Sequence, residues 1–350
     1  MSLGNELLYD FWYLAAPGQS LRKGRTLGRV MLGQGVLIGR DADGAVFALR
    51  DFCPHRGVPL SYGQFDGREI QCCFHGWRFD CTGTCTKIPS LLPTQTFRID
   101  RVKTGRFPCR EVQGNIWVYL PRPGSEPPAD ADLPAVPSTP EMGNGIYRLA
   151  AKTIYPCTMD QAAISLVDPA HVSYVHRSWW WRGGTNVKIK EKKFEPSPLG
   201  FDMVWHEPSS NSKGYRVFGS KMITEIRFQL PGLRVESIKV GGGQICTLMA
   251  LTPIGPNETE LHLFFYWTNP WITPLFPLFK KFARTFLEQD RAILDKQRQG
   301  LNGDPDLMLI NDADRPTRWY LQLKKELAAA RSEGRPFQNP IQPTVLRWQT

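Results

Sequence analysis

The chain has 350 residues, of which 41% are hydrophobic, and a formal net charge of +10. A chain of this length can bury a sizeable core and is expected to form two domains. It has no run of eighteen apolar residues, and its first residues lack the pattern of a secretory signal, so we predict a cytoplasmic protein without a membrane-spanning helix.

Residues 1–120 are expected to form an antiparallel β domain. Short apolar runs occur at 30–32, 35–39, 45–49 and 115–120, with Gly- and Asp-containing turns between them. Runs of this length with such punctuation are typical of strands joined by tight turns. The pattern predicts a domain whose loops carry its chemistry.

Two of these loops combine cysteine with histidine. Cys53-Pro54-His55 is followed, sixteen residues later, by Cys72-Cys73-Phe74-His75. A Rieske [2Fe–2S] cluster needs this set, because two cysteines bind one iron and two histidines bind the other. A structural zinc site is the alternative, although zinc usually takes a cysteine pair followed by a histidine pair.

The residues after each pair, Arg56-Gly57 and Gly76-Trp77, also resemble those of Rieske proteins. The resemblance implies that Cys53, His55, Cys72 and His75 bind the cluster. Cys73 could replace Cys72, but the family spacing favours Cys72 and leaves Cys73 as a buried thiol. We expect the other cysteines, including the Cys81 and Cys85 pair, to be free thiols in a reducing compartment.

Residues 121–144 are predicted to link two domains. Seven prolines occur among the twenty residues 121–140, a composition that favours a stiff, extended connection. The second domain is then expected to span residues 145–350. Thr158 can cap a helix over 159–167, strands are expected near 221–230, 244–252 and 260–267, and helices near 278–299 and 316–331.

The end of the first of these helices carries Asp168, His171 and His176. Two imidazoles and one carboxylate form the facial triad of non-haem Fe(II) oxygenases, which leaves three positions open. Residues five apart on an unbroken helix lie about 140° apart and could not share one ion. Because Pro169 should interrupt the helix, both rings could converge. The alternative is a pair of structural histidines.

The basic residues are spread along the chain, and no nucleic-acid-binding motif is present, so no nucleic-acid partner is expected. The densest group is Lys188, Lys190, Lys192 and Lys193, in a strand-like segment. Such lysines usually form a solvated face, and they could also attract an acidic electron donor.

The stretch 264–281 is dense in aromatic residues and ends in Lys280-Lys281. Segments of this kind occur at membrane interfaces, so peripheral membrane contact is one interpretation. A buried segment before a helix is the other. Cavity-lining residues could come from the strands and from the helix beside the metal, although packing in the core is favoured for each one; the candidates are Ile164, Val167, Val172, Met222, Ile226 and Met249.

The order of these features resembles the α-subunits of Rieske non-haem iron oxygenases over nearly the whole chain. The resemblance implies an α+β protein in which an antiparallel β Rieske domain precedes a helix-grip (START-like) catalytic domain. It also implies that His171 and His176 bind the mononuclear iron. The stretch around Ile293 is similar to the family's late acidic helix and makes Asp290 the third ligand, facing inward with Ile293, Leu294 and Gln297.

By the same resemblance, Asp168 is a catalytic residue that conducts electrons rather than a ligand. It would bond to His171 and to His75 of an adjacent subunit, so the resemblance implies a homotrimer. Many members carry an asparagine three or four residues before this aspartate, whereas this chain has Ile164 and Ser165. No asparagine is therefore expected beside the iron.

These features predict an O₂-dependent oxidoreductase, either a monooxygenase or a dioxygenase. A reductase, with or without a ferredoxin, would supply electrons, so NAD(P)H is used only indirectly. The expected substrate is bulky and hydrophobic, such as a steroid, triterpenoid or polycyclic aromatic, which is hydroxylated or oxidatively demethylated. The alternative is a Rieske electron-transfer protein without oxygenase chemistry. That alternative leaves the triad candidates without a purpose.

Overall fold

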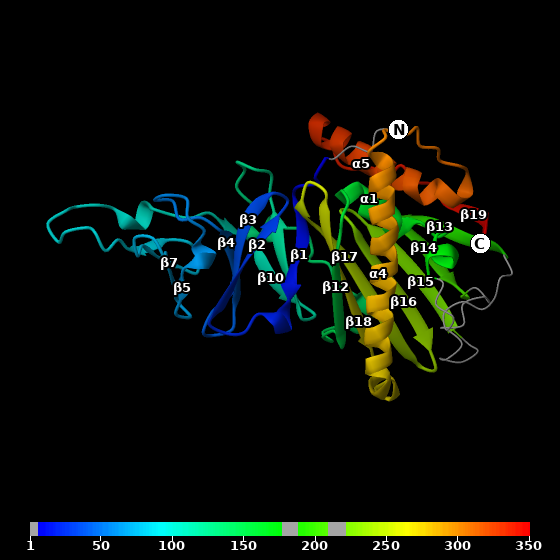
Figure 1. The fold of residues 1–350 in the computed structure, drawn as a ribbon, viewed down its shortest axis with the longest axis horizontal. Helices are drawn as coiled ribbons and strands as arrows, with labels where there is room; N and C mark the ends of the chain where they lie inside the picture. Colours follow the sequence, from blue (N-terminus) through cyan, green and yellow to red (C-terminus); the bar gives the residue numbers. More distant parts are fainter. Residues whose placement is uncertain (1–5, 177–187, 209–221) are drawn as a thin grey trace. The chain divides into compact units, whose positions relative to one another are not determined.

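A computed structural model describes residues 6–176, 188–208 and 222–350 (Figure 1). The chain divides into two compact units. One comprises residues 7–138 together with 252–256, and the other comprises most of residues 139–251 and 257–350. Among the described residues, none of the helices is long and apolar enough to cross a bilayer.

The N-terminal unit consists of three antiparallel sheets. The first has the order β1-β11-β10, the second β2-β3-β4-β9 and the third β5-β6-β7-β8. This arrangement confirms the predicted antiparallel β domain. The strands are β1 (Phe11–Pro17), β2 (Arg25–Met31), β3 (Gln34–Arg40), β4 (Val46–Arg50), β5 (Gln64–Phe65), β6 (Glu69–Gln71), β7 (Arg78–Asp80), β8 (Cys85–Lys87), β9 (Arg106–Phe107), β10 (Cys109–Val112) and β11 (Asn115–Leu120).

The proline-rich segment after β11 packs against these strands. The Trp12 indole donates a hydrogen bond to the Pro134 carbonyl at 2.8 Å, and Arg110 forms an ion pair with Asp130 at 2.6 Å. The segment up to residue 138 thus lies within the N-terminal unit. The proline-rich segment is therefore held against the N-terminal unit by specific contacts, which its proline content alone does not predict.

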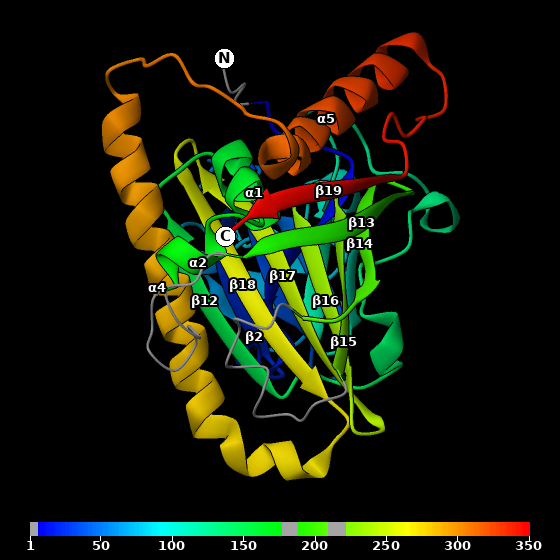
Figure 2. The ribbon, with the colours of Figure 1, turned by 90° about the vertical axis from the view of Figure 1, so that its right-hand side faces the viewer.

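The C-terminal unit contains one eight-stranded sheet, with the order β12-β18-β17-β16-β15-β14-β13-β19. Figure 2 shows this sheet with helices on the side facing the viewer. The strands are β12 (Leu149–Tyr155), β13 (Ile189–Ser197), β14 (Gly200–His206), β15 (Met222–Gln229), β16 (Leu233–Val240), β17 (Gly243–Gly255), β18 (Glu258–Trp267) and β19 (Thr344–Gln349).

Within residues 6–176, 188–208 and 222–350, four α-helices accompany this sheet: α1 (Met159–Val167), α2 (Val172–Val175), α4 (Phe276–Leu301) and α5 (Arg315–Glu333). The Thr158 hydroxyl and the Gln161 side chain form a capping box that starts α1, as the sequence predicts. Helix α4 runs along β12 (Figure 2), and α1 packs against α4, α5 and β18. A sheet wrapped beside a long C-terminal helix confirms the predicted helix-grip form.

A buried ion pair joins α1 to α5. Lys324 Nζ lies 2.6 and 2.7 Å from the two carboxylate oxygens of Asp160, and the Tyr320 hydroxyl donates to the same carboxylate at 2.6 Å. Because Asp160 and Lys324 are both buried, each needs the other to offset its lost hydration. The contact fixes the helix that leads to Asp168.

Within the aromatic stretch 264–281, the side chains of residues 264–267 are buried in β18. Their burial supports the interpretation of a buried segment before a helix for this part of the stretch. These four aromatic residues are therefore not available to a membrane surface.

Candidate metal centres

The two loops that carry cysteine and histidine have the same backbone hydrogen bonds. In the loop after β4, Gly57 N–H donates to the Cys53 carbonyl and Cys53 N–H donates to the Val58 carbonyl. In the loop between β6 and β7, Gly76 N–H donates to the Cys72 carbonyl and Cys72 N–H donates to the Trp77 carbonyl. Gly57 and Gly76 have φ values of 75° and 69°, a region that glycine occupies at little cost. The paired sequence motifs therefore fold into paired loops.

These loops bring four donor side chains together. Cys53 and Cys72 are buried, the rings of His55 and His75 are 4.4 Å apart, and the His55 ring stacks on Trp77 at 4.5 Å. Burial raises the pKa of the Cys53 thiol to about 11, and a hydrogen bond with Cys72 adds to this effect. Buried neighbouring thiols of this kind are stabilised as thiolates when iron binds.

One observation shows that the donors suit a bound metal group. His55 Nδ1 is buried and, within the described part of the chain, has no hydrogen-bond partner. A buried ring nitrogen without a partner is costly unless it binds a ligand.

Cys73 is exposed, which corrects the prediction of a buried thiol. All eight cysteines are free, as expected.

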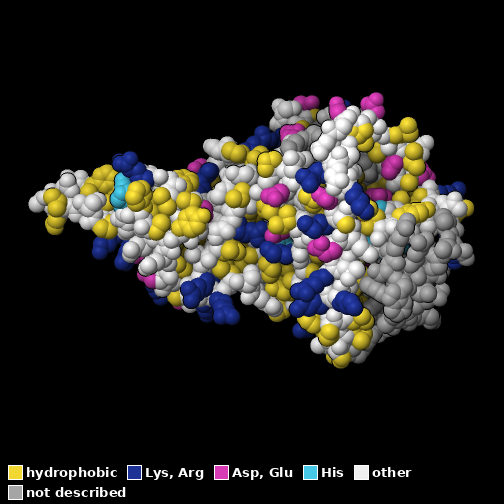
Figure 3. Space-filling model, viewed as in Figure 1, with side chains coloured by type: hydrophobic (Ala, Val, Ile, Leu, Met, Phe, Trp, Pro, Cys, Tyr) yellow, Lys and Arg dark blue, Asp and Glu magenta, His cyan; other side chains and the backbone are white. Residues whose placement is uncertain are grey.

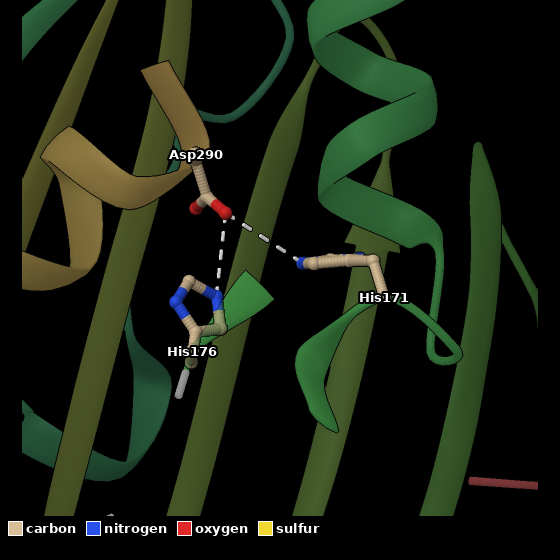
Figure 4. A group of neighbouring side chains, drawn as sticks. All are labelled: His171, His176 and Asp290. Atoms are coloured by element: carbon tan, nitrogen blue, oxygen red, sulfur yellow. Dashed lines mark ion pairs between the residues drawn. The ribbon is translucent and has the colours of Figure 1, made fainter. Parts of the chain in front are cut away.

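A second group of donors lies in the C-terminal unit. His171, His176 and Asp290 each offer a ligand atom, and these atoms all lie within 4.8 Å of one another (Figure 4). The Asp290 Oδ1 atom lies 3.3 Å from His176 Nε2 and 3.8 Å from His171 Nε2. Helix α1 ends at Val167 and α2 begins at Val172, so the predicted break around Pro169 is confirmed and lets both rings converge.

The electrostatics of this group also suit a metal cation. Burial lowers the pKa of His176 to about 4, so this ring is neutral at pH 7, and its buried Nε2 makes no hydrogen bond among the described residues. Burial raises the pKa of Asp290 to about 6. A divalent cation would bind both the lone pair of the ring nitrogen and the carboxylate, removing the cost of burying them.

Three further side chains support these donors. The Asp168 carboxylate lies 3.4 Å from His171 Nδ1. Burial lowers the pKa of His171, but the hydrogen bond and the negative charge of Asp168 outweigh this effect, so the pKa is raised. Gln289 Oε1 lies 3.1 Å from His176 Nδ1. The Tyr155 hydroxyl donates to Asp290 at 3.5 Å.

Sequence reasoning missed the roles of Gln289 and Tyr155. Gln289 precedes Asp290, so its position was the only available signal, whereas nothing marks Tyr155. The predicted inward face of α4 was partly wrong, because Ile293 and Gln297 are exposed while Leu287, Asp290 and Leu294 are buried. The buried residues Leu287, Asp290 and Leu294 are three and four apart, so the buried face of α4 is rotated from the predicted one.

A cavity of about 270 Å³ adjoins the donors and is lined by α1, α4 and the inner face of the sheet. Asp168, His171 and Asp290 lie in its wall, and most of the remaining wall is aliphatic or aromatic. Of the predicted lining residues, Val167, Val172, Ile226 and Met249 line the cavity, whereas Ile164 and Met222 are not in its described wall.

Lys190 and Lys192 also line this cavity. This corrects the prediction of a solvated lysine face for these two residues. The two lysines are half-buried on the same face of the strand as the buried Phe194, whereas their neighbour Ile189 is 78% exposed. Elsewhere on the visible surface, basic side chains are spread among acidic ones (Figure 3).

Comparison with known proteins assigns both halves of the chain. Residues 11–98 match the family "Rieske [2Fe-2S] domain", and residues 157–330 match "Vanillate O-demethylase oxygenase C-terminal domain". The fold resembles that of dicamba monooxygenase bound to dicamba, with a TM-score of 0.70 at 20% identity over 93% of this chain and 98% of the other. The caffeine complex of NdmA from Pseudomonas putida CBB5 gives 0.68 at 18% identity, covering 96% of each chain.

Two curated relatives are similar in sequence. Chloroplastic chlorophyllide a oxygenase from Arabidopsis thaliana is 27% identical over 85% of this chain and 53% of its own length. The 4beta-methylsterol monooxygenase of Methylococcus capsulatus is 36% identical over 39% of this chain and 36% of its own length. The chain therefore spans about half the length of the first relative and about a third of the second.

Proposed function

This chain belongs to the Rieske non-haem iron oxygenases, and on that premise we propose that it is a terminal oxygenase that hydroxylates or oxidatively demethylates a bulky hydrophobic substrate. The observation that carries the proposal is the convergence of His171, His176 and Asp290 in the wall of an apolar cavity. An electron carrier needs neither the three donors nor the cavity.

The two sets of donors have different tasks. Cys53, His55, Cys72 and His75 would hold a [2Fe–2S] cluster, and His171, His176 and Asp290 would hold a mononuclear iron. When bound, the cluster supplies single electrons and the mononuclear iron activates O₂. Asp168 orients His171, Gln289 orients His176, and the apolar wall excludes water from the reacting carbon.

The histidine edge of the cluster loops is open to a partner. His75 is exposed, as are the neighbouring Phe74 and Tyr62, and histidine surface flanked by hydrophobic side chains is visible in Figure 3. We propose that a reductase or ferredoxin docks near this edge. By family resemblance, His75 also meets Asp168 of a neighbouring subunit in a homotrimer, which would make the assembly part of the electron path.

The cavity supports the proposed substrate class. Its aromatic and aliphatic wall suits a steroid, triterpenoid or polycyclic skeleton better than a small polar molecule. Candidate substrates can be screened by mass spectrometry of apolar ligands that stay bound during anaerobic purification.

Iron content separates the oxygenase from the electron carrier. Anaerobically reconstituted wild-type protein should hold three irons per chain, two in the cluster and one in the triad. Asp290→Ala should hold two irons and keep the Rieske electron paramagnetic resonance signal. Glu288→Ala, which removes an exposed carboxylate from the same helix, is the matched control and should hold three. Two irons in the wild type would favour the electron carrier, and zinc in place of cluster iron would overturn both.

A further inference from the structure

We propose that Lys190 and Lys192 form an anion-binding subsite within the catalytic cavity, so that the substrate combines an apolar skeleton with an anionic group, most simply a carboxylate. This inference rests on the proposed function, because it treats the cavity beside the three metal donors as the substrate pocket. It adds a specificity determinant that the apolar wall does not predict.

The first argument is the direction of the two lysines. Lys190, Lys192 and Phe194 occupy every second position of β13 and therefore share one face of the sheet, the inner one. Phe194 is buried against Trp319. They pair across β19 with Trp348 and Leu346, which are also buried. Both lysines are half-buried in a wall that is mostly apolar, which is unusual because lysine is usually exposed.

The second argument is charge balance along the same strand. The outward residues are paired, since Lys193 lies 2.7 Å from Glu195 and Glu191 lies 2.7 Å from Arg347. Neither inward lysine forms an ion pair with any residue in the described ranges. Lys192 Nζ donates to the Glu207 carbonyl at 2.8 Å, which satisfies one of its three protons, and the Glu207 carboxylate acts on Lys192 only through Coulombic attraction.

The third argument is the charge of the rest of the cavity. Of the acidic residues in the cavity wall, Glu236 forms an ion pair with Arg234 at 3.3 Å, and Asp168 and Asp290 belong to the candidate metal centre. Lys190 and Lys192 lie two residues apart on one face of β13, both half-buried; burial lowers the pKa of both, and Lys190 lowers that of Lys192 further. An anionic group between them would replace the lost hydration and relieve their repulsion.

The fourth argument is position. Lys188, at the start of this strand, exchanges backbone hydrogen bonds with Thr350, and the Thr350 hydroxyl donates to the Ala170 carbonyl at 3.1 Å. The strand that carries the lysines therefore starts beside the loop between Asp168 and His171. An anion held there would fix one end of the substrate while its apolar body lies against the wall formed by α4 and the sheet.

Matched ligands test the proposal without turnover. The iron-loaded protein would be titrated anaerobically by calorimetry with 2-naphthoate and cholate, each beside its neutral primary amide. We expect at least one acid to bind about tenfold or more tighter than its amide, the scale of a hydrogen bond to a charged group. 2-Naphthalenesulfonate and 2-naphthyl phosphate distinguish a carboxylate site from a general anion site.

Lysine variants locate the effect. Lys190→Gln/Lys192→Gln should remove the preference for acid over amide, whereas Lys193→Gln, on the outward face of the same strand, should keep it. Each single variant should show a partial loss, which keeps the test valid if the double variant does not fold. Equal binding of acid and amide, no binding of either acid, or an acid preference that survives in folded lysine variants would overturn the proposal.

These outcomes are separable from those of the oxygenase proposal. A third iron that is lost in Asp290→Ala, together with equal binding of acid and amide, would leave the oxygenase standing and remove only the anion subsite. A lysine-dependent preference for the acid in a protein that holds only two irons would support the anion subsite and contradict the oxygenase proposal.

Discussion

Replacing Gln289 with leucine should weaken iron binding at the triad. The Gln289 Oε1 atom lies 3.1 Å from Nδ1 of His176, whose pKa is lowered by burial to about 4. The neutral ring therefore carries its single proton on Nδ1, toward the carboxamide oxygen, and keeps the Nε2 lone pair directed at Asp290. Leucine has a similar shape and removes the acceptor oxygen together with the N–H donors of the carboxamide.

The expected loss follows from this geometry. Without the acceptor, the ring can carry its proton on Nε2, where it blocks the metal, while an unpaired buried Nδ1–H costs about 1–3 kcal/mol. Stacking of Phe286 on the ring at 3.7 Å should keep the ring plane in place. We therefore expect Fe(II) affinity to fall about 10- to 100-fold, the range for lost partners of metal-binding histidines.

The assay is anaerobic competition for Fe(II) between the cluster-loaded protein and a coloured chelator. Gln289→Glu restores an acceptor and should recover most of the affinity, and Gln297→Leu, at an exposed position of the same helix, is the matched control. If Gln289→Leu binds Fe(II) within twofold of the wild type, packing against Phe286 alone orients His176, and the hydrogen-bond reasoning is refuted.

Two further predictions concern the path to the triad and the helix that supports it. Asp168→Asn should keep three irons and the oligomeric state but slow oxidation of the reduced cluster by O₂ and substrate, measured by stopped-flow absorbance; an unchanged rate would remove Asp168 from the electron path. Lys324→Met should lower the free energy of unfolding by about 3–5 kcal/mol in urea, because it leaves the buried Asp160 carboxylate without its cation. Lys325→Met, one residue along and exposed, should change it by less than about 0.5 kcal/mol; similar losses in both variants would show that the ion pair is not the cause.

Local signals predicted the scaffold of the metal centre well. The capping residue Thr158 fixed the start of α1, and Pro169 fixed the break that lets His171 and His176 converge. Both features depend on backbone chemistry within a few residues, so they can be read from the chain. Asp290 lies more than a hundred residues away and was reached by family resemblance, because no local periodicity states which distant helix meets α1.

Contacts between distant elements were not accessible in the same way. The hydrogen bond between Gln289 and His176 depends on the rotation of α4 against β12, and that rotation also exposes Ile293, which the helical periodicity had placed inward. A shift of one residue in the buried face of a helix changes which neighbour of Asp290 reaches the metal donors. Sequence patterns fix the helix but not this rotation.

The segment from Lys188 to Phe194 shows why a wrong local prediction can be informative. The lysines of this segment were predicted to form one solvated face, because alternating lysines in a strand are usually exposed. In the structure Lys190 and Lys192 share a face of β13 with the buried Phe194, so the sheet turns both lysines toward the cavity. The opposite register would turn Glu191, Lys193 and Glu195 inward, so the register that buries Phe194 leaves Lys190 and Lys192 half-buried at the cavity. Half-buried ammonium groups in an otherwise apolar wall are a local conflict of the kind expected at functional sites, which supports the proposal that the two lysines recognise substrate.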